Sequence, residues 1–185
     1  MGEEKLQNSA IAGTLAIDLG STTTVVAFAA AGERNPRLLD LPPISQRVGE
    51  VPSLLWLSDE SPLLGQQVVA AGLADQDDPR LARDFKRHIG RTEIDSQNKG
   101  SQVKDDQAAR AGALLLEGIW SLLPQQLRVE RLVLTAPVET YRSYRSWLLE
   151  ACAALPVEEI ALVDEPTAAA LGAGLPPGAR LLVVD

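Results

Sequence analysis

Apolar residues form two short runs near the start of the chain, at residues 14–19 and 25–30. A glycine and four consecutive hydroxyl residues separate the runs, which is typical of two strands joined by a tight turn. A third short run at residues 37–41 has the same character. The pattern therefore predicts an antiparallel meander of three strands.

Residues 42–100 follow a less regular pattern. In residues 79–88, apolar side chains recur every four positions with basic residues between them, which predicts an amphipathic helix. A polar loop is expected at residues 92–100. We interpret this region as a small α+β subdomain, at about residues 42–102, inserted at the edge of a sheet. Its other expected elements are strands at 45–48 and 53–57 and a helix at 66–74.

Strands and helices alternate in the remainder of the chain. The apolar spacing predicts helices at residues 104–123, 140–154 and 167–174, and strands at 131–135, 160–163 and 181–184. This alternation favours parallel strands joined by right-handed crossovers. The fold class is therefore α/β, with a mixed sheet of three antiparallel strands followed by two parallel ones.

Candidate chemistry lies where the parallel strands end. Asp18 ends the first strand, Pro137 follows the fourth and Glu165 follows the fifth. Ligands of open α/β sheets bind outside the carboxyl ends of the strands. The sequence therefore predicts that two carboxylates converge at one edge.

The turn after Asp18 adds a candidate phosphate site. Gly20 permits close backbone approach, and Ser21, Thr22 and Thr23 offer consecutive N–H donors and three hydroxyls. A carboxylate beside such donors suits Mg²⁺, which prefers one or two carboxylates together with water and phosphate oxygens. Taken alone, the same residues also fit an ordinary hairpin turn.

Composition narrows the function classes. The 185 residues include 17 basic and 25 acidic ones, a net charge of -8, which argues against nonspecific binding to nucleic acid or anionic membranes. Cys152 and His88 are the only residues of their kinds, which excludes an internal disulfide and a Cys/His zinc cluster. No long apolar run is present, so we expect a cytoplasmic protein with a disordered tail at residues 1–12.

Six segments resemble the ATPase domain of the 70-kilodalton heat-shock chaperones in order and approximate spacing. The resemblance covers about residues 13–185 and implies a ribonuclease-H-like, actin-type ATPase lobe. The segment E-P-T-A-A-A-L is quite specific among actin-like ATPases. The matching segments are residues 17–23 (I-D-L-G-S-T-T), 51–53 (V-P-S), 64–66 (L-G-Q), 85–91 (F-K-R-H-I-G-R), 134–137 (L-T-A-P) and 165–172 (E-P-T-A-A-A-L-G).

The resemblance implies ATP and Mg²⁺ as ligands. Asp18 would hold the waters around Mg²⁺, and Glu165 would help to position metal or the attacking water. Pro137 and Arg145 match a pair that relays nucleotide state. The residues implied to contact the phosphates are Gly20, Ser21, Thr22 and Thr23, and Asp185 is a further candidate metal ligand.

Two departures from the family affect the expected activity. Val69 stands four residues after Gly65, where we place the catalytic lysine of the family, and the flanking motifs place Lys86 elsewhere. We therefore expect slow or absent hydrolysis. The chain also ends at Asp185, where a second phosphate loop would begin, so the second lobe and the peptide-binding domain are expected to be absent from these residues.

The implied function is that of an ATP-binding lobe of an atypical stress-response chaperone, which couples nucleotide state to binding of unfolded polypeptides. Its expected partners in the intact protein are unfolded clients, a J-domain co-chaperone and a nucleotide-exchange factor, with no nucleic acid or membrane. ATP hydrolysis is expected of the intact protein and not of these residues alone, which we expect to be monomeric. The alternatives are an actin-like filament protein and a non-hydrolysing reactivating factor or scaffold.

Overall fold

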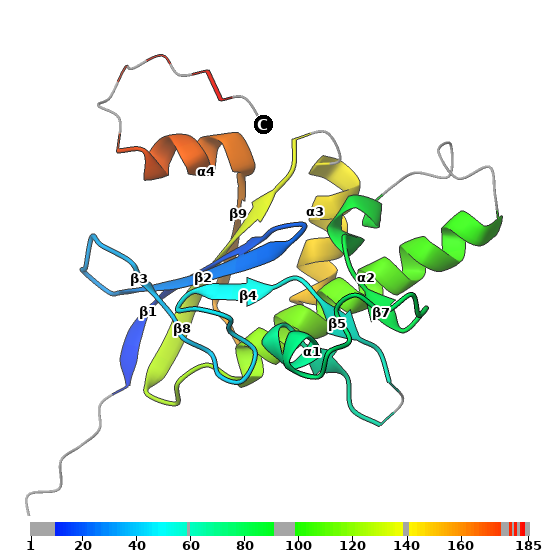
Figure 1. Ribbon diagram of the computed structural model, residues 1–185. Helices are drawn as coiled ribbons and strands as arrows, with labels where there is room; N and C mark the ends of the chain where they lie inside the picture. The colour runs from blue at the N-terminus through cyan, green and yellow to red at the C-terminus, as the bar shows by residue number, and fades with distance from the viewer. Residues whose placement is uncertain are drawn as a thin grey trace, which may run out of the picture.

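The computed structural model describes residues 10–58, 60–90, 99–138, 141–174, 178, 180, 182 and 183. A mixed sheet forms the centre of this part of the chain (Figure 1). Its strands run in the order β3-β2-β1-β8-β9, and β4 pairs with the free part of the β2 edge. The strands are β1 (Ile11–Leu19), β2 (Thr23–Ala30), β3 (Arg37–Leu38), β4 (Glu50–Pro52), β8 (Leu127–Ala136) and β9 (Glu159–Asp164).

Strand directions agree with the sequence prediction. β1 and β2 form an antiparallel hairpin, and β3 pairs antiparallel with β2. β8 runs parallel to β1, and β9 runs parallel to β8. The expected α/β class, with antiparallel strands followed by two parallel ones, is therefore confirmed.

The hydrophobic core lies on one face of this sheet. Along β1, Leu15, Ile17 and Leu19 are buried, whereas the residues between them are more exposed. Because successive side chains of a strand point to opposite faces, this alternation defines a core face. Apolar side chains of α2 (Lys99–Ser121) and α3 (Tyr141–Ala151) join the same core and cover that face (Figure 1).

The fourth helix, α4 (Glu165–Gly172), lies over the opposite face. Ala168 and Leu171 of this helix border a hollow together with β1 and β8 residues that alternate with the buried ones. None of the α4 residues is buried, and Leu171 is 72% exposed. The helix therefore adds no buried side chain to the core.

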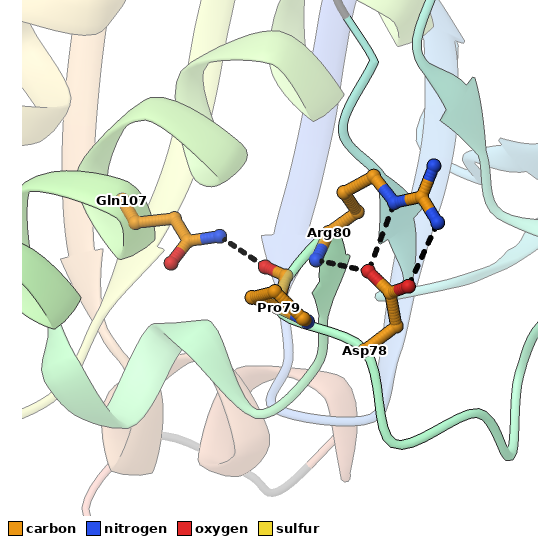
Figure 2. A network of polar contacts seen from close by, with 4 residues as sticks. All are labelled: Asp78, Pro79, Arg80 and Gln107. Carbon is orange, nitrogen blue, oxygen red and sulfur yellow. Dashed lines mark hydrogen bonds and ion pairs between the residues drawn. The ribbon is translucent and has the colours of Figure 1, made fainter.

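A smaller three-stranded sheet lies beside the main one, in the order β6-β5-β7. Arg80 forms a two-pronged pair with Asp78, and its guanidinium also lies over the Trp56 ring, 4.6 Å from the centroid. Gln107 of α2 donates a 2.7 Å hydrogen bond to the Pro79 carbonyl, which ties this sheet to α2 (Figure 2). The elements here are β5 (Leu55–Trp56), β6 (Leu63–Leu64), α1 (Gln66–Ala70), β7 (Leu81–Ala82) and the 3-10 helix η1 (Phe85–His88).

The helix predicted at residues 79–88 does not form. Leu81 pairs with Trp56 in the small sheet, and the Arg80 carbonyl accepts from the Leu57 N–H, so this backbone serves a strand instead. Asp84 then has a left-handed φ of 53°, which no α-helix interior accepts. Only a single 3-10 turn follows, with Phe85 buried in the core.

Two predicted strands are also wrong. Residues 45–48 contain no strand, because the Ile44 and Ser45 N–H groups both bond to the Leu41 carbonyl and form a turn. In the 181–184 run, Leu182 and Val183 belong to no strand and Leu182 is 85% exposed, while residues 181 and 184 lie outside the described part. Within the described residues, no helix combines the length and apolarity needed to cross a membrane.

Candidate functional site

Asp18 lies at the carboxyl end of β1, beside the equivalent end of β8. The parallel register pairs Ile17 with Leu134, so the next residues, Asp18 and Thr135, come side by side. The Thr135 hydroxyl donates a 2.5 Å hydrogen bond to Asp18 Oδ1. This bond orients a carboxylate that is otherwise exposed to solvent at the sheet edge.

Glu165 follows the end of β9 and begins α4. Asp164 caps this helix, since its carboxylate accepts a 2.9 Å hydrogen bond from the Thr167 N–H, and Pro166 occupies the first turn. β9 pairs with β8 so that Asp164 lies opposite Ala136. Glu165 therefore projects from the same edge of the sheet as Asp18.

Lys86 of η1 forms an ion pair with Glu165. Its Nζ lies 2.5 Å from Glu165 Oε1, and the two side chains are only 11% and 28% exposed. A charge-assisted contact in such shielded surroundings is stronger than a surface pair. The expectation that Lys86 lies away from the candidate site is therefore wrong. Anchoring of the neighbouring Phe85 in the core, with the turn at Asp84, directs this segment toward α4.

Val69 occupies a different part of the molecule. It lies on α1, which follows Gly65 and packs beside β6, and it is 37% exposed. α1 and α4 are well separated in Figure 1. Val69 is also not among the residues that border the hollow beside Asp18.

The turn between β1 and β2 is fixed by a buried serine. The Ser53 hydroxyl donates to the Gly20 carbonyl at 2.8 Å and lies 2.9 Å from the Thr24 hydroxyl. The Ser53 N–H also bonds to the Thr22 carbonyl at 2.9 Å. A Cβ added at Gly20 would lie 2.2 Å from the Thr23 carbonyl oxygen, so the tightness of the turn requires glycine. The turn residues Ser21, Thr22 and Thr23 remain partly or fully exposed.

Tyr144 of α3 lies within electrostatic reach of both carboxylates. Burial raises the pKa of its phenol, and the charges of Glu165 and Asp18 raise it further.

The two residues assigned to a relay come from neighbouring parts of the fold, the end of β8 and α3. Pro137 directly follows β8 and is half-buried, and Arg145 lies on the exposed side of α3. Asp185, the further candidate metal ligand, lies outside the described residues. Thr135 and Tyr144 were not singled out as site residues from the sequence. For Thr135, a signal was present in the predicted parallel alignment of the first and fourth strands.

Two of the hollows among the described residues border the main sheet. The smaller one, about 280 Å³, lies between α4 and the sheet and includes Asp18 and Thr135 among otherwise apolar residues. The larger one, about 630 Å³, lies at the opposite end of β1, where Arg131 and Glu159 form a salt bridge. The larger hollow contains none of the candidate site residues, so its size does not indicate the place of the chemistry.

The residues at the Asp18 edge fit a hydrated magnesium ion with a phosphate group. Among the described residues, no cluster of three or more His, Cys, Asp or Glu side chains could hold a metal by itself. Mg²⁺ bound with phosphates does not need such a cluster, because one or two carboxylates suffice. Asp18 supplies an oriented carboxylate, the neighbouring turn supplies hydroxyl groups, and Lys86 supplies a positive charge.

No protein-family model matches this chain, and no curated protein matches it significantly.

Proposed function

We propose that this chain is the phosphate-binding lobe of an actin-type ATPase of the 70-kilodalton heat-shock chaperone kind. The observation that carries the proposal is the meeting of Asp18, the Gly20–Thr23 turn, Lys86 and Glu165 near the carboxyl ends of three parallel strands. These groups come from three separate parts of the chain. Phosphoryl transfer depends mainly on positioning and on charge neutralisation, which such a constellation can provide.

Each residue has a distinct role in this proposal. The turn after β1 binds phosphate oxygens through N–H and hydroxyl donors, and Thr135 holds the Asp18 carboxylate in one orientation. Lys86 places a positive charge beside the transferred phosphoryl group, and Glu165 holds Lys86 in position. The second oxygen of the Glu165 carboxylate can accept a proton from water. Bound Mg²⁺ would neutralise charge on the phosphate oxygens, with Asp18 holding its water ligands.

Lys86 changes the expected rate of hydrolysis. The cation that we expected to be lost at Val69 is supplied in this proposal by Lys86, so hydrolysis by the intact protein need not be slow. In this proposal, the intact protein couples nucleotide state to the binding of unfolded polypeptides. It also interacts with a J-domain co-chaperone and a nucleotide-exchange factor.

Single-turnover ATP hydrolysis by the intact protein tests this assignment. Lys86→Met removes the cation but keeps a chain of similar length, and it should slow hydrolysis by about a hundredfold or more, as the loss of other preorganised charge-stabilising groups does. Val69→Lys serves as the matched control and should leave the rate unchanged, because α1 lies away from α4. A large rate increase from Val69→Lys, with no effect of Lys86→Met, would overturn the assignment of Lys86.

A further inference from the structure

The turn between β1 and β2 lacks the hydrogen bond that usually closes a four-residue turn. In residues 20–23 that bond would run from the Thr23 N–H to the Gly20 carbonyl, and it is not among the hydrogen bonds of the described residues. The Gly20 carbonyl accepts instead from the Ser53 hydroxyl, at 2.8 Å. A residue between β4 and β5 therefore occupies the acceptor that the turn would use for itself.

Ser53 and Thr24 are the polar residues that the described part of the chain buries most completely, at 1% and 0% exposure. A buried hydroxyl costs free energy unless it is hydrogen-bonded. Ser53 has a single hydroxyl hydrogen, which the Gly20 carbonyl accepts, so the Thr24 hydroxyl is the donor in its 2.9 Å contact with Ser53. Both buried hydroxyls therefore serve to hold the Gly20 carbonyl.

The same serine also holds a second carbonyl of the turn, because its N–H bonds to the Thr22 carbonyl at 2.9 Å. In a trans peptide, the carbonyl group and the N–H of the next residue point in opposite directions. The Gly20 and Thr22 carbonyls are both drawn toward Ser53. The N–H groups of Ser21 and Thr23 therefore point away from it.

The polar groups of the turn are available to a ligand. Within the described residues, the Ser21 and Thr22 N–H groups make no hydrogen bond, and neither do the hydroxyls of residues 21–23. All three residues are partly or fully exposed. Successive N–H groups in a turn form a concave site for anions. Because the Asp18 carboxylate lies next to this turn, the anion that fits is one that carries a divalent cation, such as a magnesium-bound phosphate.

We propose that Ser53 is a positioning residue of the phosphate site, which keeps the β1–β2 turn open by occupying the Gly20 carbonyl and so presents the Ser21 and Thr23 N–H groups to a phosphate oxygen. Ser53 is buried and does not touch the phosphate itself. Without its hydroxyl, the Gly20 carbonyl turns toward the Thr23 N–H, and rotation of that peptide also moves the Ser21 N–H. The inference rests on the proposed phosphate-binding function and adds the residue that prepares the turn.

Amide hydrogen exchange in the chain without phosphate tests the state of the turn. Ser53→Ala should slow exchange of the Thr23 amide at least about tenfold, because this N–H gains the Gly20 carbonyl as its acceptor. A role of Ser53 in stability alone predicts the opposite, faster exchange at Thr23. Ser53→Cys has a side chain of similar size with a much weaker donor, and it repeats the test if the alanine variant does not fold.

An NMR titration with Mg²⁺ and inorganic pyrophosphate tests the link to binding. The amide signals of Ser21 and Thr23 should shift on binding to the wild-type chain, and Ser53→Ala should weaken the affinity about tenfold. Ser45→Ala is the matched control, because the Ser45 hydroxyl holds a different turn by accepting a 2.9 Å hydrogen bond from the Leu41 N–H. The control should change the affinity by less than about twofold.

The two measurements separate the possible results. Slower exchange at Thr23 together with weaker pyrophosphate binding supports the inference. Unchanged or faster exchange at Thr23 in Ser53→Ala, or an unchanged affinity for pyrophosphate, would overturn it. If the wild-type chain binds no pyrophosphate, the phosphate-binding function is contradicted, and exchange at Thr23 still decides whether Ser53 keeps the turn open.

Discussion

Ser53 organises the turn that the candidate site depends on, although it lies 33 residues from the glycine it contacts. Its side chain is 1% exposed and its hydroxyl joins the Gly20 carbonyl to the buried Thr24 hydroxyl. Removing one member of such a group leaves the others buried without partners. The shape of the turn is therefore set by a residue outside it.

Ser53→Ala should lower the free energy of unfolding by about 1–3 kcal/mol, because the Thr24 hydroxyl and the Gly20 carbonyl lose their partner. Urea unfolding measures this change. Ser58→Ala is a suitable control, since the Ser58 hydroxyl makes only exposed contacts with Ser61 among those recorded, and it should change stability by less than about 0.5 kcal/mol. Equal effects of the two variants would contradict this role for Ser53.

At the residue scale, the sequence predicted the positions of single candidate side chains better than it predicted which side chains contact each other. Asp18 and Glu165 could be assigned to one edge because both follow strands that were predicted to be parallel. The contact between Lys86 and Glu165 joins residues 79 apart, and it depends on a turn at Asp84 that no apolar spacing indicates. Local patterns contain no information about such a long-range contact, so Lys86 was misplaced.

At the element scale, α4 is held by its first turn more than by its packing. None of its residues is buried, whereas Asp164 caps it and Lys86 pairs with Glu165. A short helix without a buried face has little intrinsic stability. The position of Glu165 therefore depends on these polar contacts.

Asp164→Ala should increase hydrogen exchange of the α4 amides, because the cap at Thr167 is lost, while exchange in β1 and β8 stays unchanged. Hydrogen bonding from Thr167 lowers the pKa of Asp164 from its ordinary value of 3.8. The stabilisation is therefore complete above that ordinary value, and it is lost as pH falls through the lower value of the folded state. Exchange measured at neutral and at strongly acidic pH tests this, and an equally protected α4 in Asp164→Ala would refute the role of the cap.

The elements predicted from the sequence were those with long, consistent periodicity. The strands β1, β2, β8 and β9 and the helices α2 and α3 contribute a full face to one core, so their patterns reflect their burial. The 79–88 segment failed because Leu81 and Phe85, spaced as on a helix, are also compatible with a two-residue strand followed by a 3-10 turn. The segment forms a strand and not a helix because Leu81 and Ala82 pair with β5. Local apolar spacing does not indicate this long-range pairing.

At the scale of the whole molecule, the candidate site lies on an open edge. Asp18 and Thr22 are exposed, and the hollow beside α4 is lined mostly by apolar side chains. A nucleotide bound here would make contacts through its phosphates on one side only. Association has an entropic cost that so few contacts offset poorly.

We therefore expect residues 1–185 alone to bind Mg·ATP no more tightly than about millimolar. Isothermal titration calorimetry on this chain measures the affinity directly. Pyrophosphate should bind about as well as ATP, since the phosphates make most of the contacts. Micromolar affinity for ATP, or a strong preference for ATP over pyrophosphate, would show that the chain itself contains an adenosine pocket.

The central position of β1 also determines the order in which the molecule can fold. β1 pairs locally with β2, but its other edge must receive β8, and the bond between Thr135 and Asp18 joins residues 117 apart. Parallel pairing over such a separation is slow compared with hairpin formation. During synthesis and refolding, the β1–β2 hairpin therefore exists for a time with an open edge that a second chain can occupy. Refolding yield should consequently fall as protein concentration rises, and the site should be assembled only after β8 has joined the sheet.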